Sequence, residues 1–197
     1  EVVWEPVVVE GSVPLPGRLV GAASNALFGF FGRSSELEAF TDASKRAEAS
    51  ERCHAIFVAG EAGMGKTSLV AQATRAAHAD GVVVLFGHSD EGLGVAYQPW
   101  IEVISALVPH IDPGLLAEMR SAQRAALARL VPEVGGDGDR VADPDTERLL
   151  LLEGTVELLA TVSAHEPVMV VLYDLHWADT ASLQVLRHLI ASPTPTR

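Results

Sequence analysis

Apolar residues form three short, continuous runs that are typical of buried strands. These runs are rich in β-branched residues and cover positions 54–59, 82–86 and 168–173. Between and after them, apolar residues recur at helical spacing. This second pattern predicts helices at 35–49, 68–78, 99–108, 113–130, 144–164 and 180–191. Apolar strands that alternate with helices are typical of a parallel sheet with helices on both faces, so we predict a three-layer α/β/α fold.

The first part of the chain, up to about residue 32, lacks a helical pattern. Residues 1–6 predict a short strand, and the proline- and glycine-containing segment 11–17 predicts an extended linker. The apolar, glycine-bearing segment 28–33 then leads into the first predicted helix. We therefore expect residues 1–27 to be a linker and residues 28–197 to form the folded core.

Composition limits the possible classes of function. The chain has 197 residues, is 48% hydrophobic and carries a formal net charge of −12. This suits one domain with a full core, and an acidic surface argues against direct nucleic-acid binding. The single cysteine, Cys53, excludes an intrachain disulfide, which fits a reducing cytosol. No signal peptide is visible and no apolar run approaches the ~18 residues of a membrane span, so we predict a cytoplasmic protein.

The segment from Gly60 to Thr67 carries the clearest chemistry. It matches G-x-x-x-x-G-K-[ST], a loop whose backbone N–H groups surround a phosphate. The predicted strand before it and the predicted helix after it supply the required context, although a glycine-rich turn that caps a helix remains an alternative. The predicted nucleotide-binding residues of this loop are Gly60, Glu61, Ala62, Gly63, Met64, Gly65, Lys66, Thr67 and Ser68.

A second element of such a site is an acid at the end of a neighbouring strand. Asp174 follows the apolar run 168–173 and fits this role. We predict that Thr67 and Asp174 hold Mg²⁺ and that Lys66 and Asp174 are the catalytic residues. The alternative for Asp174 is that it caps a turn.

At these motifs the chain resembles the AAA-like ATPase modules of bacterial STAND signalling proteins, found in large actinobacterial regulators. The likeness covers about residues 28–192, and the matching stretches are 31–33 with 35–37, 60–67, 90–100 and 174–179. The resemblance implies a P-loop NTPase fold that binds ATP or ADP with Mg²⁺. It also implies that Gly32 and Arg33 lie near the adenine and ribose, whereas the alternative for Arg33 is a solvated cation at a helix start.

The chain departs from this family at Tyr173. Such modules have two successive acids at the end of the strand, and the first of them falls on Tyr173 here. A phenol is neutral near pH 7 and cannot replace a carboxylate. Either Asp174 takes over the metal role, or the site binds nucleotide and hydrolyses it slowly or not at all.

The resemblance also suggests the setting of the module. Residues 1–6 resemble the closing strand of class III nucleotide cyclase domains. The expected partners are therefore other domains of the same polypeptide, such as an upstream cyclase-like domain or a downstream LuxR-type helix-turn-helix domain, and a homo-oligomer is possible. Because residues 193–197 lead toward the family's next strand, we expect a truncated core whose sheet lacks at least one strand.

The sequence thus predicts an ATP/ADP-binding switch module of a signalling or transcriptional regulator. Two alternatives stay open. One is a non-hydrolysing protein-interaction scaffold, which Tyr173 favours. The other is a small-molecule P-loop kinase, which would need an arginine-rich lid, whereas the central arginines mostly lie at helical spacing. The seven histidines show no ligand spacing that predicts zinc.

Overall fold

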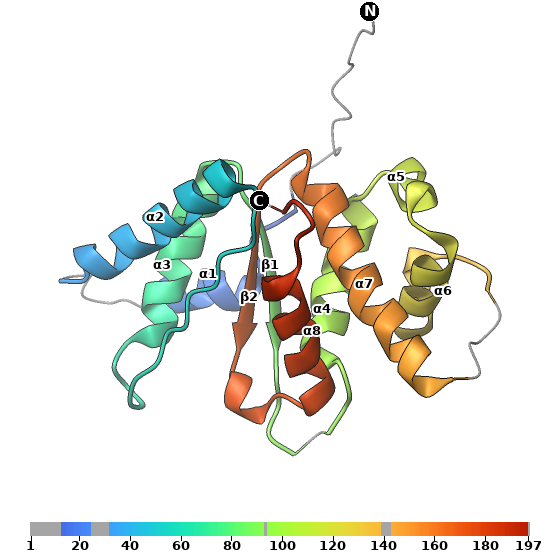
Figure 1. The fold of residues 1–197 in the computed structure, drawn as a ribbon. Coiled ribbons are helices and arrows are strands. Elements are labelled where there is room, and N and C mark those ends of the chain that lie inside the picture. Colours follow the sequence, from blue (N-terminus) through green and yellow to red (C-terminus); the bar gives the residue numbers. More distant parts are fainter. Residues whose placement is uncertain (1–12, 25–31, 93, 139–142, 197) are drawn as a thin grey trace, which may run out of the picture.

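Two strands form a parallel pair at the centre of the molecule. The computed structural model describes residues 13–24, 32–92, 94–138 and 143–196. Within this part, β1 (Val83–His88) pairs in parallel with β2 (Val168–Tyr173), and the register places Val83 opposite Val168 and His88 opposite Tyr173. Helices lie on both sides of the pair, with α1, α2 and α3 on one side and α4, α7 and α8 on the other (Figure 1). The predicted parallel arrangement with helices on both faces is confirmed for these strands.

The predicted strand at 54–59 does not form. Residues 53–60 are coil, and the side chains of Ile56 and Phe57 are 40% and 69% exposed. A strand needs a ladder of hydrogen bonds to a neighbour, and no residue in the described part of the chain pairs with this segment. The prediction of a strand here was wrong, because the apolar composition is not matched by a paired neighbour.

Most predicted helices are confirmed. They are α2 (Ser34–Ser50), α3 (Lys66–Ala79), α4 (Gln98–Leu107), α7 (Pro144–Ser163) and α8 (Thr180–Ala191). The predicted helix at 113–130 is instead broken into α5 (Pro113–Glu118) and α6 (Ser121–Leu130). Met119 and Arg120 have ψ angles of 147° and 129° at the break, and this turn buries Met119 in the core at 5% exposure. Short 3₁₀ turns are found at Val108–His110, Pro132–Val134 and Leu175–Trp177.

A helix also forms where the sequence predicted a linker. α1 (Gly17–Ser24) packs against α3, and Val13 and Leu19 are only 5% and 2% exposed. The eight residues of α1 are too few to show a helical period, so its burial against α3 was not visible in the sequence. The strand predicted at 1–6 and most of the segment 28–33 lie outside the described residues. The domain division at residue 28 stays a prediction.

The hydrophobic core lies between β1 and the helices that follow it. α4 contributes Trp100, Val103, Ile104 and Leu107, which are all 1% exposed or less. They pack with apolar side chains of β1, α6, α7 and α8, including Leu85, Leu127, Leu158 and Val185. No helix in the described residues has the length and hydropathy needed to cross a membrane.

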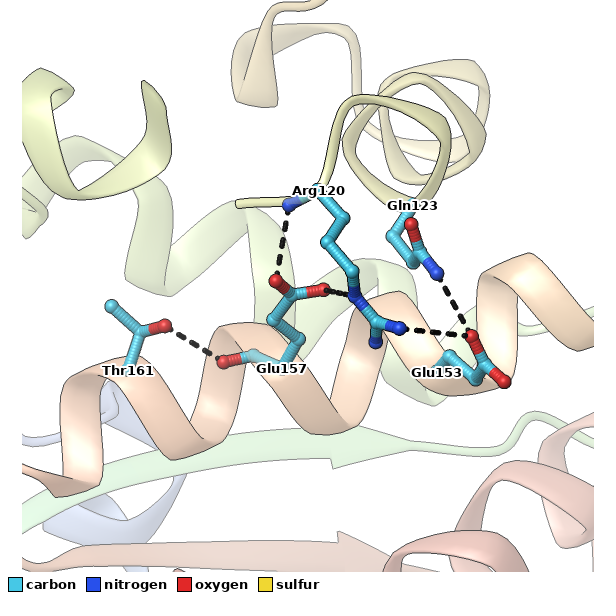
Figure 2. A network of polar contacts seen from close by, with 5 residues as sticks. All are labelled: Arg120, Gln123, Glu153, Glu157 and Thr161. Carbon is cyan, nitrogen blue, oxygen red and sulfur yellow. Dashed lines mark hydrogen bonds and ion pairs between the residues drawn. The ribbon is translucent and has the colours of Figure 1, made fainter. Parts of the chain in front are cut away.

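A polar network joins the start of α6 to α7 at the surface (Figure 2). The Arg120 backbone N–H and Nε both donate to the Glu157 carboxylate, at 3.0 and 3.1 Å. Gln123 donates to Glu153 at 2.8 Å, and the Arg120 guanidinium lies 3.6 Å from the same carboxylate. Because the Arg120 side chain is 61% exposed, these ion pairs orient the two helices more than they stabilise them.

Three helices begin directly after an aspartate that caps them. Asp112 accepts from the backbone N–H of Gly114 in α5, and Asp143 accepts from that of Thr146 in α7. Hydrogen bonds from Thr146 hold the pKa of the Asp143 carboxyl below its usual range. Asp179 caps α8 by accepting from the N–H groups of Ala181 and Ser182 at 2.9 and 3.0 Å.

Asp179 has a second role that makes it the most important of these caps. Its other carboxylate oxygen accepts from the Tyr97 N–H at 3.2 Å and so ties the start of α4 to α8. We expect Asp179→Ala to lower the free energy of unfolding by about 2 kcal/mol, since a cap and a tertiary hydrogen bond are lost together. Urea denaturation would measure this. Asp112→Ala, which removes only a local cap, is expected to cost about 1 kcal/mol, and equal losses in both variants would contradict the tertiary role.

Candidate functional site

The loop from Gly60 to Gly65 turns tightly before α3 begins. Gly63 and Gly65 have φ angles of 80° and 78°, a left-handed conformation that residues with a side chain adopt rarely. Gly65 is the N-cap of α3, and no side chain in the described residues caps this helix. The first N–H groups of α3 therefore have no intrahelical partner, and they face outward with the positive end of the helix dipole. This arrangement suits a phosphate group.

Two cationic side chains are held against this loop. The Lys66 ammonium donates to the carbonyls of Gly60 and Glu61, both at 2.8 Å. The Arg33 guanidinium, which comes from the residue before α2, donates to the Met64 carbonyl. The structure thus brings Arg33 to the loop from 31 residues away, which a freely solvated cation at a helix start would not require. In a chain of net charge −12, the two cations make this loop a local positive site.

The end of β2 reaches the same loop through Tyr173. The hydroxyl groups of Tyr173 and Thr67 are hydrogen-bonded to each other across 106 residues of sequence. The Tyr173 ring also lies 6.0 Å from the Phe86 ring of β1. Tyr173 is therefore fixed between α3 and the sheet, beside the predicted phosphate site.

Asp174 follows Tyr173 and has a left-handed backbone conformation outside the strand. Its φ and ψ angles are 54° and 43°, its side chain is exposed, and it is the N-cap of the 3₁₀ turn Leu175–Trp177 without a side-chain cap bond. Its carboxylate makes no polar contact within the described part of the chain. The alternative in which Asp174 caps a turn is therefore not supported, and its role with Thr67 in holding Mg²⁺ stays a prediction.

A histidine network lies beside Tyr173, and sequence reasoning missed it. His88 ends β1, opposite Tyr173, and its ring nitrogens lie 2.8 Å from Glu102 and 2.9 Å from Asp90. Gln98 donates to Asp90 at 2.8 Å, so Asp90 is part of this network. The sequence gives no signal for it, because His88 and Glu102 meet only where α4 crosses the end of β1. The described residues contain no group of three or more His, Cys, Asp or Glu side chains placed to hold a metal ion.

Cys53 precedes the coil segment that leads to the loop. Its side chain is half-buried against the core, and burial raises the pKa of its thiol. A thiol of raised pKa is poorly nucleophilic at neutral pH, so we interpret Cys53 as a packing residue.

A cavity among the described residues lies elsewhere. It has a volume of about 540 Å³, is formed mainly by α7 and the end of α8, and includes Arg120, Glu157 and His188. None of the residues of the Gly60–Thr67 loop line it. We assign the candidate site to the loop, because an open helix end offers backbone N–H groups of the kind that bind phosphate, without the need for an enclosed pocket.

Comparison with known proteins identifies the family of the chain. The sequence profile described as AAA ATPase domain matches residues 29–197. No curated protein and no solved structure matches the chain. The matched region includes Arg33, the loop, Tyr173 and Asp174. Because the profile covers most of the chain, the protein belongs to the AAA ATPase domain family.

Proposed function

We propose that this chain is an ATP- or ADP-controlled switch module of a multidomain regulator of the STAND type, with slow or absent hydrolysis. A AAA ATPase domain is a nucleotide-binding module, and the finer assignment is our own. The observation that carries it is the convergence of Lys66 and Arg33 on the Gly60–Gly65 loop. A bound triphosphate would draw the Lys66 ammonium from the loop carbonyls to its own oxygens, and Arg33 would lie toward the nucleoside end.

Such a switch needs a structural change that nucleotide can bias. Tyr173 links the start of α3 to the end of β2, and Asp179 links α8 to the start of α4. Phosphate bound at α3 would thus act on elements that lie far apart in the sequence. A ligand shifts such an equilibrium only by its difference in affinity between the two states, so ATP and ADP must differ in their contacts here.

The kinase alternative is weaker. A kinase lid needs arginines that are free to fold over the phosphates. In the described part of the chain, Arg120 bonds to Glu157 (Figure 2), Arg124 to the Gly135 carbonyl, and Arg129 to Glu147 at 2.5 Å. These arginines are bound to neighbouring segments and are not free to form a lid. One observation still supports the scaffold alternative. The Thr67 hydroxyl is hydrogen-bonded to Tyr173 and is therefore not free to bind a metal ion.

The test is isothermal titration of the 197-residue chain with ATP, ADP and adenosine. We expect ATP and ADP to bind and adenosine to bind much more weakly, since the loop recognises phosphate. Lys66→Ala is expected to weaken ATP binding about tenfold or more, because a charge-assisted hydrogen bond contributes about 1.5–3 kcal/mol.

The chain offers a matched control, because Lys45 is its only other lysine and lies exposed on α2. Lys45→Ala changes the net charge by the same amount and is expected to leave ATP affinity unaltered. Absence of ATP and ADP binding to the unmodified chain would refute the switch and favour the scaffold.

A further inference from the structure

Tyr173 stands at the position from which a P-loop site usually draws its metal-binding acid. In P-loop NTPases, Mg²⁺ is held by the hydroxyl of the loop Ser or Thr and by an aspartate at the end of a nearby strand. Here the strand β2 ends at Tyr173, and its phenol reaches that same hydroxyl, on Thr67. Both groups are half-buried and engaged with each other.

This pair of hydroxyl groups does not fit the ion. Mg²⁺ takes near-octahedral sets of oxygen ligands and usually includes a carboxylate among them. A phenol is neutral at pH 7, so the pair offers no negative charge. For a metal to reach Thr67, the bond to Tyr173 would first have to break.

Asp174 does not restore the missing charge in this arrangement. It is exposed and lies in a left-handed turn after the strand has ended, and its carboxylate makes no polar contact with Thr67 or with any other described residue. The neutralising charges near the loop are instead Lys66 and Arg33. Two cations and the N–H groups of α3 can bind polyphosphate oxygens without an intervening metal.

Building on the proposed function, we propose that Tyr173 makes this loop a Mg²⁺-independent site for nucleoside di- and triphosphates. The Tyr173–Thr67 hydroxyl pair closes the metal position, and Lys66, Arg33 and the N–H groups of α3 bind the phosphates without a metal. Nucleotide binding and metal-assisted turnover are thereby separated in this chain, which suits a module that senses nucleotide rather than consumes it.

The test is the ratio of the ATP dissociation constants measured in EDTA and in excess Mg²⁺, by isothermal titration of the full chain. For the unmodified protein we expect the two constants to agree within about threefold. Tyr173→Asp is expected to raise the ratio to about tenfold or more. In EDTA, a carboxylate beside Thr67 would repel ATP and weaken binding. In excess Mg²⁺, the ion would bind to both the carboxylate and the phosphates and strengthen binding. A ratio of tenfold in the unmodified protein, or no change in the variant, would overturn the proposal.

Tyr173→Phe serves as a second variant that keeps the ring beside Phe86 and should fold normally. It frees the Thr67 hydroxyl without adding charge, so its ratio is expected to lie between those of the unmodified protein and Tyr173→Asp. A ratio unchanged in Tyr173→Phe, in protein whose thermal unfolding is normal, would also overturn the proposal. Tyr97→Phe, at the only other tyrosine, is the control and is expected to leave the ratio unaltered. If no nucleotide binds under either condition, the proposed function itself fails, which is a separate outcome.

Discussion

Trp100→Ala is expected to lower the free energy of unfolding by about 3–5 kcal/mol, the range for removing a large aromatic side chain from a core. Among the described residues, Trp100 is the largest fully buried side chain, with 1% exposure. Its indole N–H donates to the Ser182 carbonyl at 2.9 Å, so it also joins α4 to α8. The variant loses burial, packing and this hydrogen bond together. Urea denaturation followed by far-ultraviolet circular dichroism would measure the loss without relying on tryptophan fluorescence.

Trp177 provides a matched control for Trp100. It lies in the 3₁₀ turn after β2 and is 45% exposed, and its ring centroid lies 4.9 Å from that of the neighbouring His176. We expect Trp177→Ala to change the free energy of unfolding by no more than about 0.5 kcal/mol. Trp100→Phe should fall between the two, because it keeps an aromatic ring but leaves the Ser182 carbonyl unpaired. Equal effects at Trp100 and Trp177 would mean that α4 is not the centre of the core.

The parts of the site that are local in sequence could be predicted. The loop Gly60–Thr67 carries its own conformational requirement in its glycines, and the helix after it follows from composition. Asp179 could be recognised as a cap because capping acts over only two or three residues. Predictions of this kind need no knowledge of how distant segments pack.

The parts that depend on packing could not be predicted in this way. The bond between Thr67 and Tyr173 spans 106 residues, and the contact of Arg33 with Met64 spans 31. The position of Tyr173 at the end of a strand was visible in the sequence, but not that its hydroxyl would bond to Thr67. The network of His88 with Glu102 was invisible for the same reason, since it exists only where α4 crosses β1.

Two differences in secondary structure have a related cause. The apolar run 54–59 has the composition of a strand, but strand formation depends on a paired neighbour, and the described residues supply none. α1 is the opposite case, because a helix forms where the sequence predicted a linker. Its sequence gives little helical signal, yet burial of Leu19 stabilises the helix against α3. Tertiary contacts decide both cases, and intrinsic preference decides neither.

The second large effect on stability is expected at Gly87, where α4 crosses the end of β1. A Cβ atom added at Gly87 would lie 2.1 Å from the carbonyl oxygen of Pro99 and 2.8 Å from its carbonyl carbon. These are backbone atoms, which cannot rotate aside as a flexible side chain could. Gly87→Ala must therefore push α4 away from the end of β1, and we expect it to lower the free energy of unfolding by about 3 kcal/mol.

Gly21→Ala is the matched control for Gly87→Ala. Gly21 lies in α1, and a Cβ atom there would meet no atom within 4 Å. Alanine favours helices over glycine, so this variant should be neutral or more stable by up to about 1 kcal/mol. Both changes add the same methyl group, so the difference between them isolates the close approach of Pro99. An equally stable Gly87→Ala would show that α4 and β1 do not meet this closely. The position of His88 beside Glu102, which depends on that approach, would then have to be revised as well.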